Sequence, residues 1–186
     1  MKYVAFLRGI NVGGHKLVRM EELRSAFTSL GFKEVKTLLA SGNVLFETAA
    51  GAAEAHVARI EEKLKAAFGH EIGVQLRSIP ELLKLAETNP FKNLKITPQI
   101  RFYVTFLREK AKLRLKIPHE SPEGDFKILR VSDTEACSVI TISPHGQTTD
   151  LMAFLEKEFG RKITTRNWNT IARILESIET KALVKL

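Results

Sequence analysis

The sequence has 186 residues, of which 44% are hydrophobic and 27% charged, and it carries a formal net charge of +8. These values are typical of a soluble globular protein with one domain or two small ones. The apolar runs are too short to span a bilayer, and the single cysteine, Cys137, excludes an internal disulfide. We therefore expect a cytoplasmic protein, without a signal peptide in the opening MKYVAFLRGI and without a membrane partner.

Apolar periodicity predicts four strands and two helices in the first half of the chain. Leu23 and Phe27 fall on one helical face, and Gly31 ends that helix. Ser41 and Gly42 form a hairpin signal between two strands. The expected elements are strands at 3–8, 35–40, 43–48 and 72–78 and helices at 19–31 and 52–69. Their order, βαββαβ, is that of a ferredoxin-like unit.

The second half repeats this order without obvious sequence identity. A connector helix at 80–90 opens with Pro80 and ends at the Asn89-Pro90 pair. The expected elements are strands at 100–107, 126–132, 138–143 and 161–165 and helices at 108–116, at 148–160 and from about 167, the last with Thr165 as its N-cap. We therefore predict an α+β fold with antiparallel sheets. It consists of tandem ferredoxin-like (βαββαβ) subdomains at 1–78 and 100–165, a connector helix and loop at 79–99, and a C-terminal helix and tail at 166–186.

The stretch LRGINVGGHK (7–16) places three glycines and two bases directly after the first strand. It fails the phosphate-loop pattern GxxxxGK[ST], because His15 stands at the lysine position and Leu17 at the hydroxyl position. It also lacks the GxG spacing of dinucleotide-binding loops. Glycines still permit positive φ, so that backbone N–H groups can surround an anion. The alternative is a wide turn whose glycines only satisfy geometry.

A second polar stretch is expected beside this loop. In a ferredoxin-like sheet the third strand runs antiparallel beside the first, so the 9–17 loop and the 41–43 hairpin should lie at the same end. The candidate ligand-binding residues at this end are Arg8, Gly9, Asn11, Gly13, Gly14, Lys16, Ser41, Gly42 and Asn43.

The stretch TTRNWN (164–169) is another dense polar cluster, at the expected start of the last helix. Its hydroxyls, guanidinium and indole suit a phosphate and an aromatic base. The alternative is structural, with the helix capped by its threonine and the tryptophan packed between the subdomains. The candidates here are Thr165, Arg166, Asn167 and Trp168.

The positive charge is concentrated in residues 91–130, which hold ten Lys and Arg against four Asp and Glu. Five of these bases alternate along 108–116. If this segment is extended, all five point to one face and suit a nucleic acid backbone. If it is helical, they form a solvated basic surface, which is the favoured interpretation.

The sequence predicts no metal or cofactor site. The five histidines lack the spacing of metal ligands. Ser41 lacks the GxSxG pattern of a nucleophile elbow, and Cys137 precedes an apolar strand, which favours a buried, structural thiol.

Three long motifs indicate a family. YVAFLRGINVGGHKLVRMEELRSAFTSLGF at the start, LLASGNVLFET in the middle and TTRNWNTIARIL near the end resemble the bacterial family called domain of unknown function 1697 (DUF1697). The resemblance covers essentially the whole chain and implies a tandem duplication of two ferredoxin-like subdomains. That family has no settled activity, so the resemblance implies no catalytic residue.

Three function classes remain open. The first is binding of an anionic, phosphate-bearing ligand, such as a nucleotide or single-stranded nucleic acid, at the glycine-rich loop and the 41–43 hairpin, either alone or joined by the 165–168 cluster. The second is an enzyme acting on a phosphorylated small molecule, with Ser41, Lys16 or His15 as proton carrier, for which a deep pocket would argue. The third is a protein–protein interaction module, for which a large apolar surface would argue.

Overall fold

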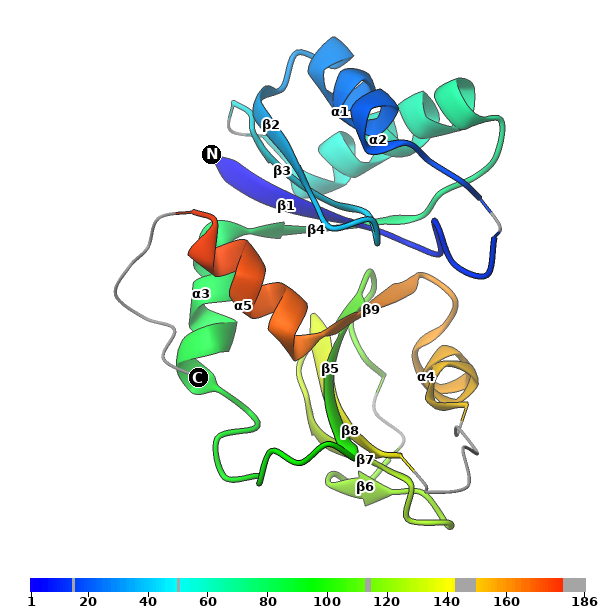
Figure 1. Cartoon of the computed structure of the whole chain (residues 1–186), viewed down its shortest axis with the longest axis vertical. Helices are drawn as coiled ribbons and strands as arrows, with labels where there is room; N and C mark the ends of the chain where they lie inside the picture. The colour runs from blue at the N-terminus through cyan, green and yellow to red at the C-terminus, as the bar shows by residue number, and fades with distance from the viewer. Residues whose placement is uncertain (15, 50, 113–114, 143–149, 179–186) are drawn as a thin grey trace. The chain divides into compact units, whose positions relative to one another are not determined.

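The computed structural model describes residues 1–14, 16–49, 51–112, 115–142 and 150–178 (Figure 1). The chain divides into two compact units, Met1–Leu82 and Leu83–Leu186. In the described residues the fold is mixed α and β, with two antiparallel sheets and five helices. None of the described helices is long and apolar enough to cross a membrane. The predicted α+β class with antiparallel sheets is confirmed.

The first unit holds a four-stranded sheet in the order β2-β3-β1-β4. Its strands are β1 (Lys2–Leu7), β2 (Lys33–Leu38), β3 (Asn43–Glu47) and β4 (Val74–Ser78). The helices α1 (Met20–Ser29) and α2 (Ala53–Phe68) lie on one face of this sheet (Figure 1). Each predicted element of the first half is therefore present, in the expected βαββαβ order.

Aromatic side chains fill the space between this sheet and its helices. Phe46 of β3 stacks on Phe32 with ring centroids 4.4 Å apart and meets Phe27 of α1 edge-on at 5.5 Å. Ile60 and Leu64 of α2 close the same core and are fully buried. Burial of these large side chains is the main stabilisation of the unit, at roughly 1.5–3 kcal/mol each.

The second unit holds a five-stranded sheet in the order β6-β7-β8-β5-β9. Its strands are β5 (Ile100–Leu107), β6 (His119–Glu120), β7 (Phe126–Val131), β8 (Glu135–Thr141) and β9 (Ile163–Asn167). The helices are α4 (Leu151–Phe159) and α5 (Trp168–Glu176), while α3 (Ile79–Thr88) crosses the boundary between the units. If β6 is set aside, the order β7-β8-β5-β9 corresponds strand by strand to β2-β3-β1-β4 of the first sheet.

The second half differs from its predicted elements in three places. The described residues of 108–116 form no helix, and β6 was not expected. The segment nevertheless buries apolar side chains, because Ala111 and Leu115 pack against the core formed by Leu107 and Phe126. Its alternating bases leave too narrow an apolar stripe for an amphipathic helix. The last strand ends at Asn167 instead of 165, so the N-cap of α5 is not Thr165.

Candidate functional site

Asn11 organises the glycine-rich loop between β1 and α1. Its Nδ2 donates to the carbonyl oxygens of Ala40 at 2.8 Å and Val18 at 3.1 Å. Its Oδ1 accepts from the backbone N–H of Val18 at 2.8 Å. The predicted proximity of this loop to the 41–43 hairpin is confirmed, because Asn11 bonds Ala40, the residue before the hairpin, and Gly42 lies against Ile10.

Two hairpin residues serve packing. Asn43 is fully buried, and its Nδ2 donates to the Leu38 carbonyl at 2.8 Å and to the Ser41 hydroxyl at 3.1 Å. Gly42 has φ of +78°, and a Cβ built there would lie 2.7 Å from Cδ1 of Ile10. The amide and the glycine therefore hold this end of the sheet together.

The other loop candidates lie nearer the surface. Gly9, Gly13 and Gly14 have φ between +59° and +76° and are exposed, whereas Arg8 is half-buried. The Lys16 amine donates to the Glu71 carbonyl at 3.0 Å. His15 lies outside the described residues. A ligand-binding role for this loop stays a prediction.

The second polar cluster spans the end of β9 and the start of α5. The Thr165 hydroxyl bonds the Thr105 hydroxyl at 2.8 Å, within the sheet. Arg166 is only 7% exposed and donates to the Thr164 hydroxyl at 2.9 Å, and burial lowers the pKa of its guanidinium to about 10. Asn167 caps α5, because its Oδ1 accepts from the Asn169 N–H at 2.9 Å. This cluster and the glycine-rich loop belong to different units, so a joint site stays a prediction.

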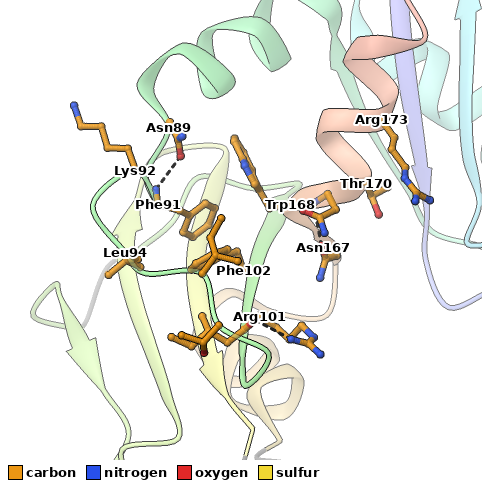
Figure 2. A pocket seen from close by; sticks show the side chains of 14 residues that line it. Asn89, Phe91, Lys92, Leu94, Arg101, Phe102, Asn167, Trp168, Thr170 and Arg173 are labelled. Atoms are coloured by element: carbon orange, nitrogen blue, oxygen red, sulfur yellow. Dashed lines mark hydrogen bonds between the residues drawn. The ribbon is translucent and has the colours of Figure 1, made fainter. Parts of the chain in front are cut away.

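A pocket of about 520 Å³ adjoins this cluster in the second unit (Figure 2). Its lining comes from the chain between α3 and β5, from the start of β5 and from α5, whose first turn and whose Arg173 in the last turn both contribute. The polar lining residues are Lys92, Arg101, Arg173, Asn89, Asn167, Asn169, Thr97 and Thr170, and the apolar ones are Phe91, Leu94, Ile96, Ile100, Phe102 and Trp168. The described lining thus contains three bases and no carboxylate.

Three aromatic rings form the apolar side of the pocket. Phe91 stacks on Phe102 with ring centroids 4.8 Å apart and planes at 28°. Trp168 meets Phe91 edge-on at 5.3 Å. Phe91 and Trp168 are 4% and 5% exposed, whereas Phe102 is only half-buried. Phe102 is therefore the ring that a ligand would meet.

The basic side chains differ in how they are held. Arg101 donates through Nη1 to the carbonyls of Pro98 at 2.7 Å and Ile100 at 2.9 Å, which positions its guanidinium beside the pocket. Arg173 is exposed on α5. In Figure 2 the Lys92 amine points away from both arginines. Within the described ranges none of the three forms an ion pair, so their charge is available to an anion.

Sequence reasoning identified Asn167 and Trp168 but missed Arg101, Phe102 and Arg173. The expected strand order could have placed Arg101 and Phe102 near Asn167. The first and last strands of such a unit are neighbours, and here Tyr103 pairs with Asn167. The start of β5 must then lie beside the start of α5, which brings the missed arginine and phenylalanine to the predicted cluster.

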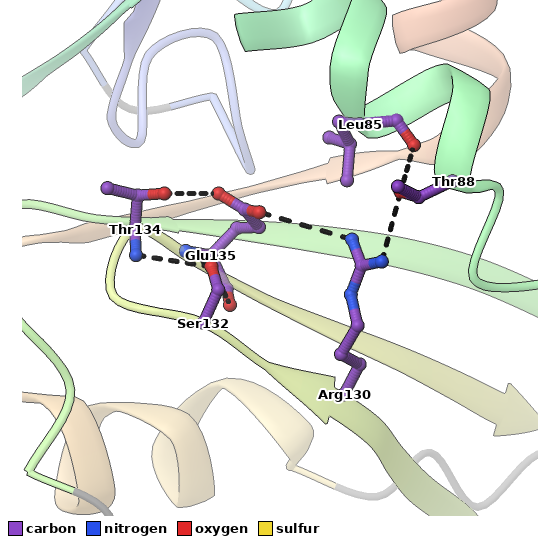
Figure 3. A network of polar contacts seen from close by, with 6 residues as sticks. All are labelled: Leu85, Thr88, Arg130, Ser132, Thr134 and Glu135. Carbon is purple, nitrogen blue, oxygen red and sulfur yellow. Dashed lines mark hydrogen bonds and ion pairs between the residues drawn. The ribbon is translucent and has the colours of Figure 1, made fainter.

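A separate polar network joins α3 to the second sheet (Figure 3). Arg130 of β7 donates to the Thr88 hydroxyl at 3.0 Å, which in turn donates to the Leu85 carbonyl at 2.9 Å. The same guanidinium lies 4.0 Å from a carboxylate oxygen of Glu135. Because these groups satisfy one another, we interpret the network as structural.

The described residues do not favour metal or thiol chemistry. No group of three or more His, Cys, Asp or Glu in the described ranges could hold a metal ion. Cys137 is buried, and desolvation raises the pKa of its thiol to about 12, so the reactive thiolate is disfavoured at neutral pH.

Fold and pocket define a two-unit α+β protein with a basic, partly aromatic pocket in its second unit. The chain belongs to the family described as Protein of unknown function (DUF1697), whose model matches residues 1–128. The solved structure of the conserved bacterial protein SP0830 from Streptococcus pneumoniae is similar, with a TM-score of 0.71 at 23% identity. The match covers 96% of this chain and 98% of that one, and at this identity it shows the fold alone. A comparison with curated proteins finds no match.

Proposed function

We propose that this protein binds an anionic, phosphate-bearing ligand in the pocket formed by the start of β5, the start of α5 and the chain before β5. Nucleotides and single-stranded nucleic acid belong to this ligand class. The observation that carries the proposal is the charge of the described lining, with Lys92, Arg101 and Arg173 and no carboxylate. The single cysteine supports a reducing, cytoplasmic setting for this binding.

The chemistry of the lining favours phosphate over a neutral ligand. A guanidinium presents several N–H donors in a planar fork that matches phosphate oxygens. The amides of Asn167 and Asn169 and the Thr170 hydroxyl add neutral donors beside Arg173. Asn167, Asn169 and Thr170 also lie at the positive end of the α5 dipole, which adds a modest attraction for anions, whereas Arg173 lies in the last turn of the helix.

The glycine-rich loop is a weaker candidate for the same ligand class. Exposed glycines at positive φ and the nearby Lys16 support an anion there. The roles of Asn11, Gly42 and Asn43 in internal contacts leave fewer groups for a ligand. We therefore place the proposed site in the second unit.

Isothermal titration with inorganic phosphate, ribose 5-phosphate and AMP tests the proposal. Arg173→Ala should weaken binding of the phosphorylated ligands about 10- to 100-fold, because a charge-assisted hydrogen bond is lost. Asn167→Asp should weaken it as well, because it places a carboxylate in the pocket while keeping an N-cap residue of equal quality. Arg161→Ala, which removes an exposed base of the same unit outside the pocket, is the matched control.

The proposal is wrong if the unmodified protein binds none of these ligands at low salt. It is also wrong if Arg161→Ala weakens binding as much as Arg173→Ala. In that case general surface charge, and not the pocket, attracts the anion.

A further inference from the structure

We infer that the phosphate-bearing ligand of this pocket is a nucleotide whose base stacks on the ring of Phe102. The inference rests on the proposed function and narrows its ligand class. It assigns the aromatic contact to Phe102 instead of Trp168, the residue that the sequence favoured.

The packing of the three rings supports this choice. Phe91 covers one face of Phe102 at 4.8 Å, and Phe91 and Trp168 are themselves almost completely buried. Phe102 lines the pocket and is only half-buried, so it offers the ligand ring surface that the other two do not. A base placed there would extend an existing stack, and such contacts are favourable for any base because each has a π face.

The two sides of the pocket match the two ends of a nucleotide. In Figure 2 the side chains of Phe102 and Leu94 lie on one side, where the Lys92 amine points outward, and those of Asn167 and Arg173 lie on the other. Leu94 is 37% exposed and Ile96 78%, so the apolar side includes aliphatic surface that a base would cover. The volume of about 520 Å³ is within the range of pockets for small molecules. A sugar phosphate would occupy the polar side and leave the apolar side in contact with water.

Binding measurements on two Phe102 variants test the inference. The ligands are AMP, CMP, ribose 5-phosphate, adenosine and inorganic phosphate. In Phe102→Leu, the affinity for AMP and CMP should fall about tenfold while that for ribose 5-phosphate stays unchanged, because only the stacking contact is lost. Phe102→Trp should keep nucleotide affinity, which controls for repacking of the site. Phe154→Leu, which removes another half-buried ring of the same unit, should bind like the unmodified protein.

The outcomes separate this inference from the proposed function. If ribose 5-phosphate binds as tightly as AMP and Phe102→Leu changes neither affinity, the base contact is wrong while the phosphate site stands. If Phe102→Trp loses nucleotide binding as severely as Phe102→Leu, the ring is structural and the inference is again wrong. If no phosphorylated ligand binds the unmodified protein, both proposals fail together.

Discussion

Gly42, which was expected from the sequence as part of a hairpin turn and as a candidate ligand-binding residue, also has a packing role. A Cβ at this position would lie 2.7 Å from Cδ1 of Ile10 and 2.9 Å from Cβ of Leu7, and φ is +78°. We expect Gly42→Ala to lower the free energy of unfolding by about 2–4 kcal/mol, since it combines left-handed strain with overpacking. Urea denaturation followed by circular dichroism measures this change.

Gly69 provides the matched control for this substitution. It has nearly the same φ, +75°, but a Cβ there would meet nothing within 4 Å. Gly69→Ala should therefore show only the conformational cost, about 1–2 kcal/mol. Equal losses for the two variants would mean that packing against Ile10 does not explain Gly42.

The same end of the first sheet shows how far single residues could be interpreted from sequence. Topology predicted that the loop of Asn11 lies beside the hairpin of Asn43, and the hydrogen bond from Asn11 to the Ala40 carbonyl agrees. Sequence could not show that both amides form hydrogen bonds with the protein's own backbone. An asparagine that stabilises a loop and an asparagine that binds a ligand look the same in a sequence, because both occur in polar, glycine-rich turns. Side-chain geometry was needed to separate these roles.

At the scale of the element, the start of α5 depends on Asn167. Its Oδ1 accepts the Asn169 N–H at 2.9 Å, whereas Thr165 lies within β9. We expect Asn167→Ala to lower the free energy of unfolding by about 1 kcal/mol and Asn167→Asp to leave it nearly unchanged, because Asp and Asn are equivalent N-caps. Thermal unfolding of the three proteins checks this. If Asn167→Ala is as stable as the unmodified protein, the cap is not what starts this helix.

Most elements were predictable because a wide apolar stripe with a glycine or proline stop leaves little choice of structure. The helices ending near Gly31, Gly69 and Gly160 are examples. The 108–116 segment was not predictable in this way. A helix was expected there only because the second half repeats the element order of the first. The alternating bases of the segment do not have the periodicity of an amphipathic helix. The pocket was missed for a related reason, since its lining combines three segments that only the pairing of β5 with β9 brings together.

At the scale of the whole molecule, two electrostatic features have to be kept apart. The chain carries a net charge of +8, and residues 91–130 hold much of the excess. A charge of this size attracts any polyanion without specificity. The pocket, in contrast, gathers three bases, two of them from 91–130, around a single volume of about 520 Å³. The two features should therefore respond differently to salt.

Salt titration of the two kinds of ligand separates the features. For a single-stranded oligonucleotide held by four phosphate contacts, the affinity should fall roughly 50-fold between 50 and 200 mM salt, because bound counterions are released. A mononucleotide held by Arg101 and Arg173 has one phosphate group and should lose less than about tenfold over the same range. Arg173→Ala should weaken the mononucleotide strongly and the oligonucleotide only slightly, which fluorescence anisotropy can follow for both. Parallel losses of both ligands in this variant would contradict the separation and would mean that nucleic acid strands enter the pocket themselves.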